Sequence, residues 1–186
     1  MPRVKASIRI ENVVACGTLN QRIDLNAVAK GYPGVEYRPK RFPGLVFRLK
    51  KPKTTTLIFN SGKMVCTGGK SEKESRRAVM KVVKELKKTG IIIIGKPDVK
   101  IVNIVATASL GGVIDLEKSA YSLKRTMYEP EQFPGLIYRM DEPKVVVLIF
   151  ASGKLVCTGA KKEEDIHEAL SKLHKKLKEE ELIYYE

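Results

Sequence analysis

The chain has 186 residues, of which 43% are hydrophobic, and its formal net charge is +14. This apolar content is enough for a packed core, whereas the absence of any run of about 18 apolar residues excludes a membrane-spanning helix. The first residues lack the apolar stretch of a secretory signal, so we expect an intracellular protein with a polyanionic partner.

The cysteines and histidines do not predict a metal site. Cys16, Cys66 and Cys157 are isolated from one another, and we expect them to be small buried hydrophobes in a reducing compartment. His167 and His174 lie on a charged helix pattern, where a solvated face is expected rather than a pair of ligands. The sequence therefore predicts neither a metal nor a cofactor.

The chain contains an internal duplication. Asn12 aligns with Asn103 and Phe42 with Phe133, each pair being 91 residues apart, and close to half of the pairs from 10–70 to 101–161 are identical. Two copies indicate a pseudo-two-fold molecule rather than a solenoid. We divide the chain into residues 1–91 and 92–186, the second part ending in a short acidic tail.

The first copy reads, in chain order, as a strand, a short helix, four strands and a long helix. The segments are "SIRIENVVA" (7–15), "DLNAVAK" (24–30) with Asp24 as N-cap, "GVEYR" and "GLVFRLK" on either side of "PKRFPG", the hairpin "TTTLIFN"/"KMVCTG", and an amphipathic helix between Ser71 and Gly90. Two copies predict an α+β fold, an antiparallel sheet of about ten strands with four helices on one face.

The other face of this sheet is apolar and has no helix to cover it. Alternation along the strands points Val13, Ile58, Met64 and Cys66 one way, and it points Asn12, Val14, Leu57, Phe59, Val65 and Thr67 the other, with Asn103, Val105, Leu148, Phe150, Val156 and Thr158 equivalent in the second copy. An uncovered apolar face indicates a dimer interface or a binding surface.

Basic residues flank that face and favour binding to DNA. Lys40, Arg41, Arg48, Lys50, Lys51, Lys53 and Lys63 belong to the first copy, and Arg139, Lys144 and Lys154 to the second. Such side chains hold phosphates while an apolar floor meets sugars and base edges. Duplex DNA also has a local two-fold symmetry that suits a duplicated surface.

Four phenylalanines stand beside turns at equivalent places, namely Phe42, Phe59, Phe133 and Phe150. Apolar wedges of this kind unstack base steps and kink the duplex from the minor groove. A platform that stacks single-stranded nucleic acid is the main alternative, and a dimerisation scaffold is another. No catalytic constellation is present, and "GGKS" (68–71) lacks the first glycine of a P-loop, so we do not expect an enzyme.

At this point the motifs resemble a known family. The segments "NVVACGTL", "FPGLVFR" and "TTTLIFNSGKMVCTGGKS", with "NIVATASL", "FPGLIYR" and "VVVLIFASGKLVCTGAK", closely resemble the TATA-box-binding protein family in its archaeal form. The resemblance implies a saddle with four helices on its convex face, whose curved sheet binds and sharply bends the minor groove of an A·T-rich promoter element. It implies a general transcription initiation factor, located in the cytoplasm with the nucleoid, that assembles with transcription factor B and, through it, RNA polymerase.

The resemblance also assigns roles to individual residues. It implies that Phe42, Phe59, Phe133 and Phe150 intercalate, and that Asn12, Val14, Leu57, Val65, Thr67, Asn103, Val105, Leu148, Val156 and Thr158 contact base edges. Arg48 and Arg139 match phosphate-contacting arginines, and we expect Lys40, Arg41, Ser61 and Ser152 to add phosphate contacts.

The two copies differ in charge. Residues 1–92 carry roughly +15 and the remainder about −1. At the turn before the Phe-Pro-Gly motif, Arg38, Lys40 and Arg41 become Glu129, Glu131 and Gln132, and carboxylates there would repel phosphates. The resemblance implies that Glu129 and Glu131 contact transcription factor B. We also expect the free protein to self-associate through its concave face, and the basic helix at 71–90 to be either a solvated surface or a partner site.

Overall fold

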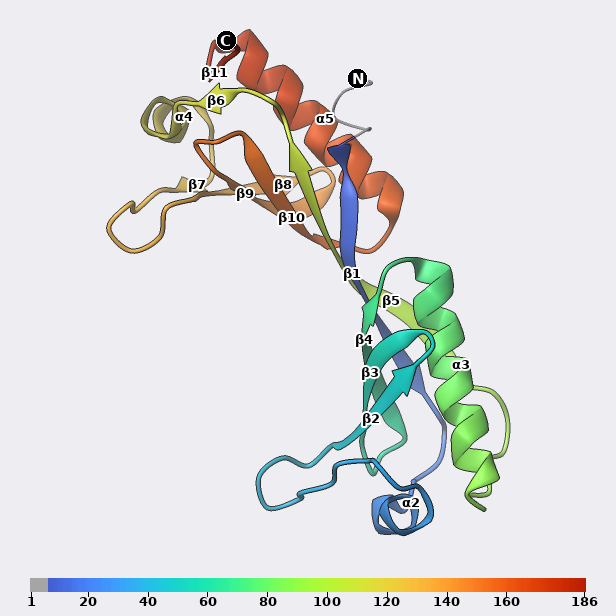
Figure 1. Ribbon diagram of the computed structural model, residues 1–186. Helices are drawn as coiled ribbons and strands as arrows, with labels where there is room; N and C mark the ends of the chain where they lie inside the picture. The colour runs from blue at the N-terminus through green and yellow to red at the C-terminus, as the bar shows by residue number, and fades with distance from the viewer. Residues whose placement is uncertain (1–6) are drawn as a thin grey trace. The chain divides into compact units, whose positions relative to one another are not determined.

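The computed structural model describes residues 7–186, which divide into two compact units. The first-repeat unit is Asn12–Val102, and the second-repeat unit combines residues 7–11 with Asn103–Glu186. Each unit is an antiparallel sheet with one long helix lying along one of its faces (Figure 1).

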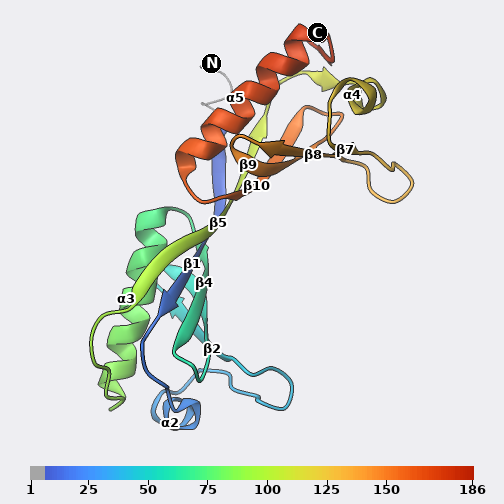
Figure 2. The same cartoon turned by 180° about the vertical axis from the view of Figure 1, so that it is seen from behind.

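The first-repeat unit has the strand order β2-β3-β4-β1. Its elements are β1 (Arg9–Thr18, of which the part from Asn12 lies in this unit), α2 (Leu25–Gly31), β2 (Leu45–Lys50), β3 (Lys53–Ile58), β4 (Lys63–Gly69) and α3 (Glu72–Lys88). The long helix α3 lies on the sheet, and the short helix α2 lies at the end of the unit where β1 finishes (Figures 1 and 2).

The second-repeat unit repeats this plan with the strand order β5-β10-β9-β8-β7. Its elements are β5 (Asp98–Ser109, from Asn103 onward), β6 (Val113–Ile114), α4 (Leu116–Ser122), β7 (Thr126–Met127), β8 (Leu136–Asp141), β9 (Lys144–Ile149), β10 (Lys154–Ala160), α5 (Glu163–Glu179) and β11 (Ile183–Tyr184). The strands β6 and β11 form a separate two-stranded sheet.

The helices begin where the sequence predicts. The Asp24 carboxylate accepts the amide of Ala27 at 3.1 Å, and the Ser71 hydroxyl accepts the amide of Glu74 at 3.0 Å, so both predicted N-caps are confirmed. Each cap satisfies one amide that the first turn of a helix leaves without an intrahelical acceptor.

The core lies between each sheet and its long helix. In the first-repeat unit, Ala78, Val82 and Leu86 on α3 and Val13 and Met64 on the sheet are fully buried. The residues assigned to the opposite face, such as Val14 and Val65, are only half-buried. The predicted division of the strands into a covered and an uncovered face is therefore confirmed.

Three expectations need correction within the described residues. The segment "GVEYR" is not a strand but a single bridge from Glu36 to Val46, so the first-repeat unit has four sheet strands and the second has five, in agreement with the expected total of about ten. His174 is 2% exposed instead of solvated, and its Nε2 lies 2.6 Å from the Tyr185 hydroxyl. Cys16 is half-buried on the uncovered face, because it alternates with Ala15, whereas Cys66 and Cys157 are buried as expected.

The segment after each long helix docks differently in the two units. In the second-repeat unit, Ile183 and Tyr184 pair with β6 by backbone hydrogen bonds. In the first-repeat unit, the Gln21 side chain takes this place, donating to the Ile92 carbonyl at 2.8 Å and accepting from the Ile94 amide at 2.9 Å. Among the described residues, no helix is both long and apolar enough to span a bilayer.

Candidate nucleic-acid interface

Each unit holds a pair of phenylalanines at the end of its sheet. The rings of Phe42 and Phe59 meet edge to face with their centroids 5.9 Å apart and their planes at 70°. Phe133 and Phe150 repeat the arrangement at 5.9 Å and 72°. Both units therefore present the same aromatic cluster, and its outer rings, Phe42 and Phe133, are 41% and 38% exposed.

The glycine of each Phe-Pro-Gly turn lies beneath these rings. A Cβ atom at Gly44 would stand 2.7 Å from Cε1 of Phe42 and 3.1 Å from Cε1 of Phe59, and at Gly135 the corresponding distances are 2.8 and 3.0 Å. Such contacts are too short for any side chain unless the rings move. The repeated glycine is therefore a packing requirement of the ring pair.

An apolar floor continues from the rings along each sheet. Leu57 pairs with Val65 in the first-repeat unit, and Leu148 pairs with Val156 in the second. These four residues are half-buried, as are Val14, Val105, Thr67 and Thr158 on the same faces. A sheet face of half-buried aliphatic side chains without a helix cover is typical of a binding surface or a dimer interface.

An asparagine is held on each floor by two hydrogen bonds. Oδ1 of Asn12 accepts the Gly68 amide at 2.7 Å, and its Nδ2 donates to Thr67 Oγ1 at 2.9 Å. Asn103 repeats this with Gly159 at 2.7 Å and Thr158 at 3.3 Å. The predicted asparagines and threonines are thus brought together in pairs.

Cationic side chains lie at the margins of both faces. Arg48 is exposed and lies 3.4 Å from the Glu36 carboxylate, which also reaches Arg38 at 3.8 Å, whereas no ion pair is found for Arg139 among the described residues. Lys40 and Arg41 are exposed in the turn before Phe42. Exposed ion pairs of this kind are weak, so the Arg48 guanidinium can leave the Glu36 carboxylate and bind a phosphate instead.

The hairpin turns that follow Phe59 and Phe150 carry Ser61 and Ser152. Both serines are exposed, and each hydroxyl accepts the backbone amide two residues later, from Lys63 and Lys154, at 3.4 Å. At that length the hydrogen bond is weak, so the hydroxyl proton stays free to donate to an anion.

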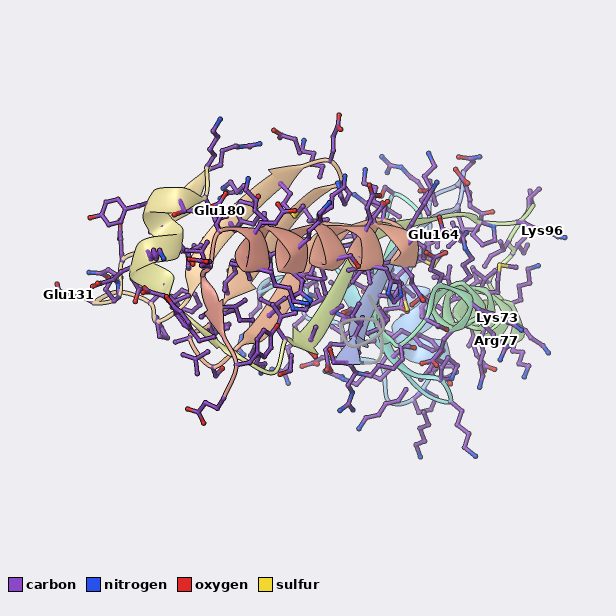
Figure 3. All side chains as sticks on the ribbon, turned by 90° about the horizontal axis from the view of Figure 1, so that it is seen from above. Lys73, Arg77, Lys96, Glu131, Glu164 and Glu180 are labelled. Carbon is purple, nitrogen blue, oxygen red and sulfur yellow. The ribbon has the colours of Figure 1, made fainter. Side chains whose placement is uncertain are left out.

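The long helices have opposite charges on their outer sides at equivalent positions. Lys73 and Arg77 project from α3, whereas Glu164 stands at the corresponding place in the first turn of α5 (Figure 3). Glu131 projects from the turn before Phe133, and both it and Glu129 are exposed (Figure 3). The charge asymmetry predicted from the sequence therefore lies on the surface.

Among the described residues, the titratable side chains do not gather into a metal centre. No cluster of three or more histidine, cysteine or acidic side chains able to hold a metal is found among residues 7–186. Burial raises the pKa of Cys157 to about 12, and burial likewise raises the pKa of Cys66. Both thiols are therefore protonated and unreactive at neutral pH.

A comparison with family models decides the identity of the fold. The model described as "Transcription factor TFIID (or TATA-binding protein, TBP)" matches the chain twice, over residues 7–89 and 98–180. The chain belongs to the TATA-binding protein family. The two matches coincide with the duplication seen in the sequence.

Curated relatives in the TATA-binding protein family agree along nearly the whole chain. The TATA-box-binding protein of Sulfolobus acidocaldarius is 57% identical over 175 residues, which cover 94% of this chain and 89% of the relative. That of Archaeoglobus fulgidus is 51% identical over 173 residues, covering 92% and 94%. The solved structure of Methanococcus jannaschii TBP matches with a TM-score of 0.84 and 53% identity, covering 93% of this chain and 99% of that one. The predicted family and its archaeal type are confirmed.

Sequence reasoning missed two lysines that shape this TATA-binding protein fold. Lys81 on α3 donates to the Lys51 carbonyl at 2.5 Å, and its equivalent Lys172 on α5 donates to the Glu142 carbonyl at 2.9 Å. Both lysines therefore tie the helix to the β2–β3 or β8–β9 hairpin rather than facing a partner. The signal that could have found them is their alignment as lysines in both copies.

Proposed function

We propose that the protein is a general transcription initiation factor that binds the minor groove of an A·T-rich TATA element with the uncovered faces of both units. Membership of the TATA-binding protein family supports the DNA target. The observation that carries the proposal is the pair of exposed aromatic clusters, Phe42/Phe59 and Phe133/Phe150, at equivalent ends of two apolar sheet faces.

In this proposal the phenylalanines enter base steps and bend the duplex. Insertion of an apolar ring unstacks a step, and the bend lets the DNA follow more of the protein surface. Phe42 and Phe133 are the more exposed members of their pairs, and Phe59 and Phe150 meet them edge to face, so each pair offers two rings for insertion. Steps that deform easily, such as TA, then add specificity without a direct contact.

The floor residues contact base edges, and the polar and cationic side chains at the margins of the floor contact phosphates. In the minor groove both A·T orientations show only acceptors, whereas G·C adds the guanine amino donor. The floor residues Val14, Leu57, Val65, Val105, Leu148 and Val156 offer that amino group no acceptor, while Asn12, Thr67, Asn103 and Thr158 supply donors. Lys40, Arg41, Arg48, Ser61, Arg139 and Ser152 hold phosphates, which makes the affinity dependent on salt.

The acidic turn of the second-repeat unit provides the protein partner site. Glu129 and Glu131 bind transcription factor B, which brings RNA polymerase to the promoter, because carboxylates beside a DNA groove are repelled by phosphates. Without DNA, the uncovered faces pair two copies of the chain. This is a binding function without catalysis, performed in the cytoplasm at the nucleoid.

Energy transfer between dyes at the two ends of a short duplex tests the proposal. The protein is titrated at two salt concentrations onto a TATA duplex, a G·C-substituted duplex and a single strand. Tight binding with a large bend on the TATA duplex alone supports the proposal, and Phe42→Ala or Phe133→Ala then reduces the bend. Binding without bending, or preference for the single strand, would instead make the sheet a stacking platform. Sedimentation at several concentrations without DNA tests the self-association.

A further inference from the structure

Each sheet contains one bulge next to its asparagine. Between β1 and β4, Val13 pairs with Gly69 and Ala15 pairs with Cys66, so that Val14 alone faces Thr67 and Gly68. Between β5 and β10, Ile104 pairs with Ala160 and Ala106 with Cys157, so Val105 alone faces Thr158 and Gly159. An extra residue in one strand leaves a backbone group outside the ladder.

The freed backbone amide in each bulge is used by the asparagine. The N–H of Gly68 donates to Asn12 Oδ1, and the N–H of Gly159 donates to Asn103 Oδ1, both at 2.7 Å. A backbone N–H can only donate, so the atom facing it must be the amide oxygen and not the nitrogen. The orientation of both side-chain amides is therefore determined by the bulge.

This orientation decides what the asparagine offers to a ligand. One N–H of Asn12 Nδ2 donates to the Thr67 hydroxyl at 2.9 Å. The Thr158 hydroxyl lies 3.3 Å from Asn103 Nδ2 and 3.4 Å from its Oδ1, so it uses at most one N–H of that amide. The amide nitrogen carries two hydrogens, and among the described residues the second has no partner. The amide oxygen is turned to the backbone, so the side of the group left for a ligand is a donor.

We propose that Gly68 and Gly159 are positioning residues for base recognition, because their amides hold Asn12 and Asn103 with the donor toward the minor groove. A donor pairs with adenine N3 or thymine O2 and has nothing to offer a guanine amino group. Without the glycine amide the side chain can rotate and present its oxygen, which accepts that amino group. The inference rests on the proposed function and assigns part of its selectivity to two backbone amides.

Glycine is required at both places by the backbone conformation. Gly68 has φ +103° and Gly159 has φ +99°, a region that side chains rarely adopt. A Cβ at Gly68 would also lie 3.2 Å from the Lys53 carbonyl oxygen, whereas at Gly159 the nearest atoms are at 3.7 Å or more. Gly159→Ala therefore changes the conformation of the bulge without a steric clash and is the better test variant.

The experiment compares duplexes in which one adenine at a time is replaced by 2,6-diaminopurine, which adds an amino group to the minor groove. We expect wild-type protein to bind the substituted duplexes less tightly than the TATA duplex. In Gly159→Ala this loss of affinity, the diaminopurine penalty, should be smaller by roughly tenfold at one or two adjacent positions. The matched control is Gly90→Ala, because Gly90 has φ +95° and nothing within 4 Å but lies far from either asparagine in the chain. It should leave the penalty at every position unchanged.

The outcomes separate this inference from the proposed function. Failure of wild-type protein to prefer the TATA duplex overturns the proposed function. Normal preference together with an unchanged diaminopurine penalty in folded Gly159→Ala overturns the positioning role alone. Should that variant not fold, the wild-type protein decides by NMR: a scalar coupling across the hydrogen bond from the Gly159 amide nitrogen to the Asn103 side-chain carbonyl carbon is expected, and its absence contradicts the inference.

Discussion

Arg38 and Glu129 occupy the same place in two turns of the same geometry and carry opposite charges. The Arg38 carbonyl accepts the amides of Arg41 and Phe42 at 2.9 and 3.0 Å, and the Glu129 carbonyl accepts those of Gln132 and Phe133 at 2.9 Å each. The backbone that presents the exposed phenylalanine is thus the same in both units. Only the side chains around it differ, and in the proposed function this difference assigns DNA to the first turn and the protein partner to the second.

Reversing the charge of the second turn should remove transcription factor B from the complex without weakening DNA binding. In Glu129→Arg with Glu131→Lys, two carboxylates become cations, so we expect recruitment of the factor to the DNA complex to fall by at least roughly tenfold. Affinity for the TATA duplex should rise and depend more steeply on salt. Gel-shift titration of both ligands measures these effects.

The matched control reverses the first turn. Arg38→Glu with Lys40→Glu should weaken DNA binding while the remaining complex still recruits the factor. Equal recruitment by wild type and by the variant of the second turn would contradict the assignment of Glu129 and Glu131.

Truncating the exposed phenylalanines should affect DNA bending far more than stability. Phe42 and Phe133 are 41% and 38% exposed, so alanine removes less buried area than it would at a core position, and we expect the melting temperature to fall by only a few degrees. The bend should shrink and the dissociation constant rise roughly tenfold, because the wedge that unstacks the base step is gone. Phe47 is the control, being fully buried in the same unit; Phe47→Ala should cost about 3–5 kcal/mol of stability. Unchanged bending by both exposed-ring variants would contradict wedge insertion.

The duplication made most of this fold predictable. Alternation along β1 and β4 placed Val13 and Met64 in the core and Val14 and Val65 on the uncovered face, because the period of a strand is two whatever its neighbours. The caps Asp24 and Ser71 were also predictable from local sequence, because a helix N-terminus needs a side-chain acceptor next to its first turn. The site residues were found by resemblance, and their roles on DNA stay predictions.

What the sequence could not predict depends on contacts between distant segments. His174 lies in the buried stripe of α5 with Leu170 and Leu177, but the Tyr185 hydroxyl that meets its imidazole comes from a segment that the helix pattern does not show. The bulges at Gly68 and Gly159 follow from strand register, which is set across pairs rather than along one strand. The segment "GVEYR" has strand propensity, but only Glu36 finds a partner in β2.

The three cysteines should separate by reactivity. Cys16 is half-buried on the uncovered face, whereas Cys66 and Cys157 are fully buried and have pKa values raised by burial, to about 12 for Cys157. A thiol reagent at pH 8 should therefore modify one cysteine per native chain, since only the thiolate reacts. A TATA duplex should protect it, because it lies on the proposed DNA face. Mass spectrometry of digested protein identifies the modified residue, and rapid labelling of Cys157 in the folded protein would contradict its burial.

The stability of the second-repeat unit should fall as the solution becomes mildly acidic. Burial lowers the pKa of His174, with a smaller effect from the Lys178 ammonium, so the folded-state pKa lies below the unfolded value of 6.5. A depressed pKa means that the stabilisation is fully present above pH 6.5 and is lost as the pH falls toward the folded-state value. Protonation would also place a charge in a site that is closed to water, beside the Tyr185 hydroxyl at 2.6 Å. We expect the melting temperature to drop between pH 7 and pH 5.

The variant His174→Val isolates this effect, because Val83 fills the equivalent place on α3 and is 3% exposed. Valine cannot titrate, so the fall in melting temperature between pH 7 and pH 5 should be smaller in the variant. The difference should be roughly 2–4 °C for each kcal/mol of pH-dependent stability that the substitution removes. Tyr185→Phe supplies the second arm: it deletes the hydroxyl but keeps the buried imidazole, so the pH dependence should remain while the stability at pH 7 decreases. Scanning calorimetry from pH 5 to pH 8 measures all three proteins. Parallel curves for wild type and His174→Val would show that another group, and not this imidazole, couples the fold of the second-repeat unit to pH.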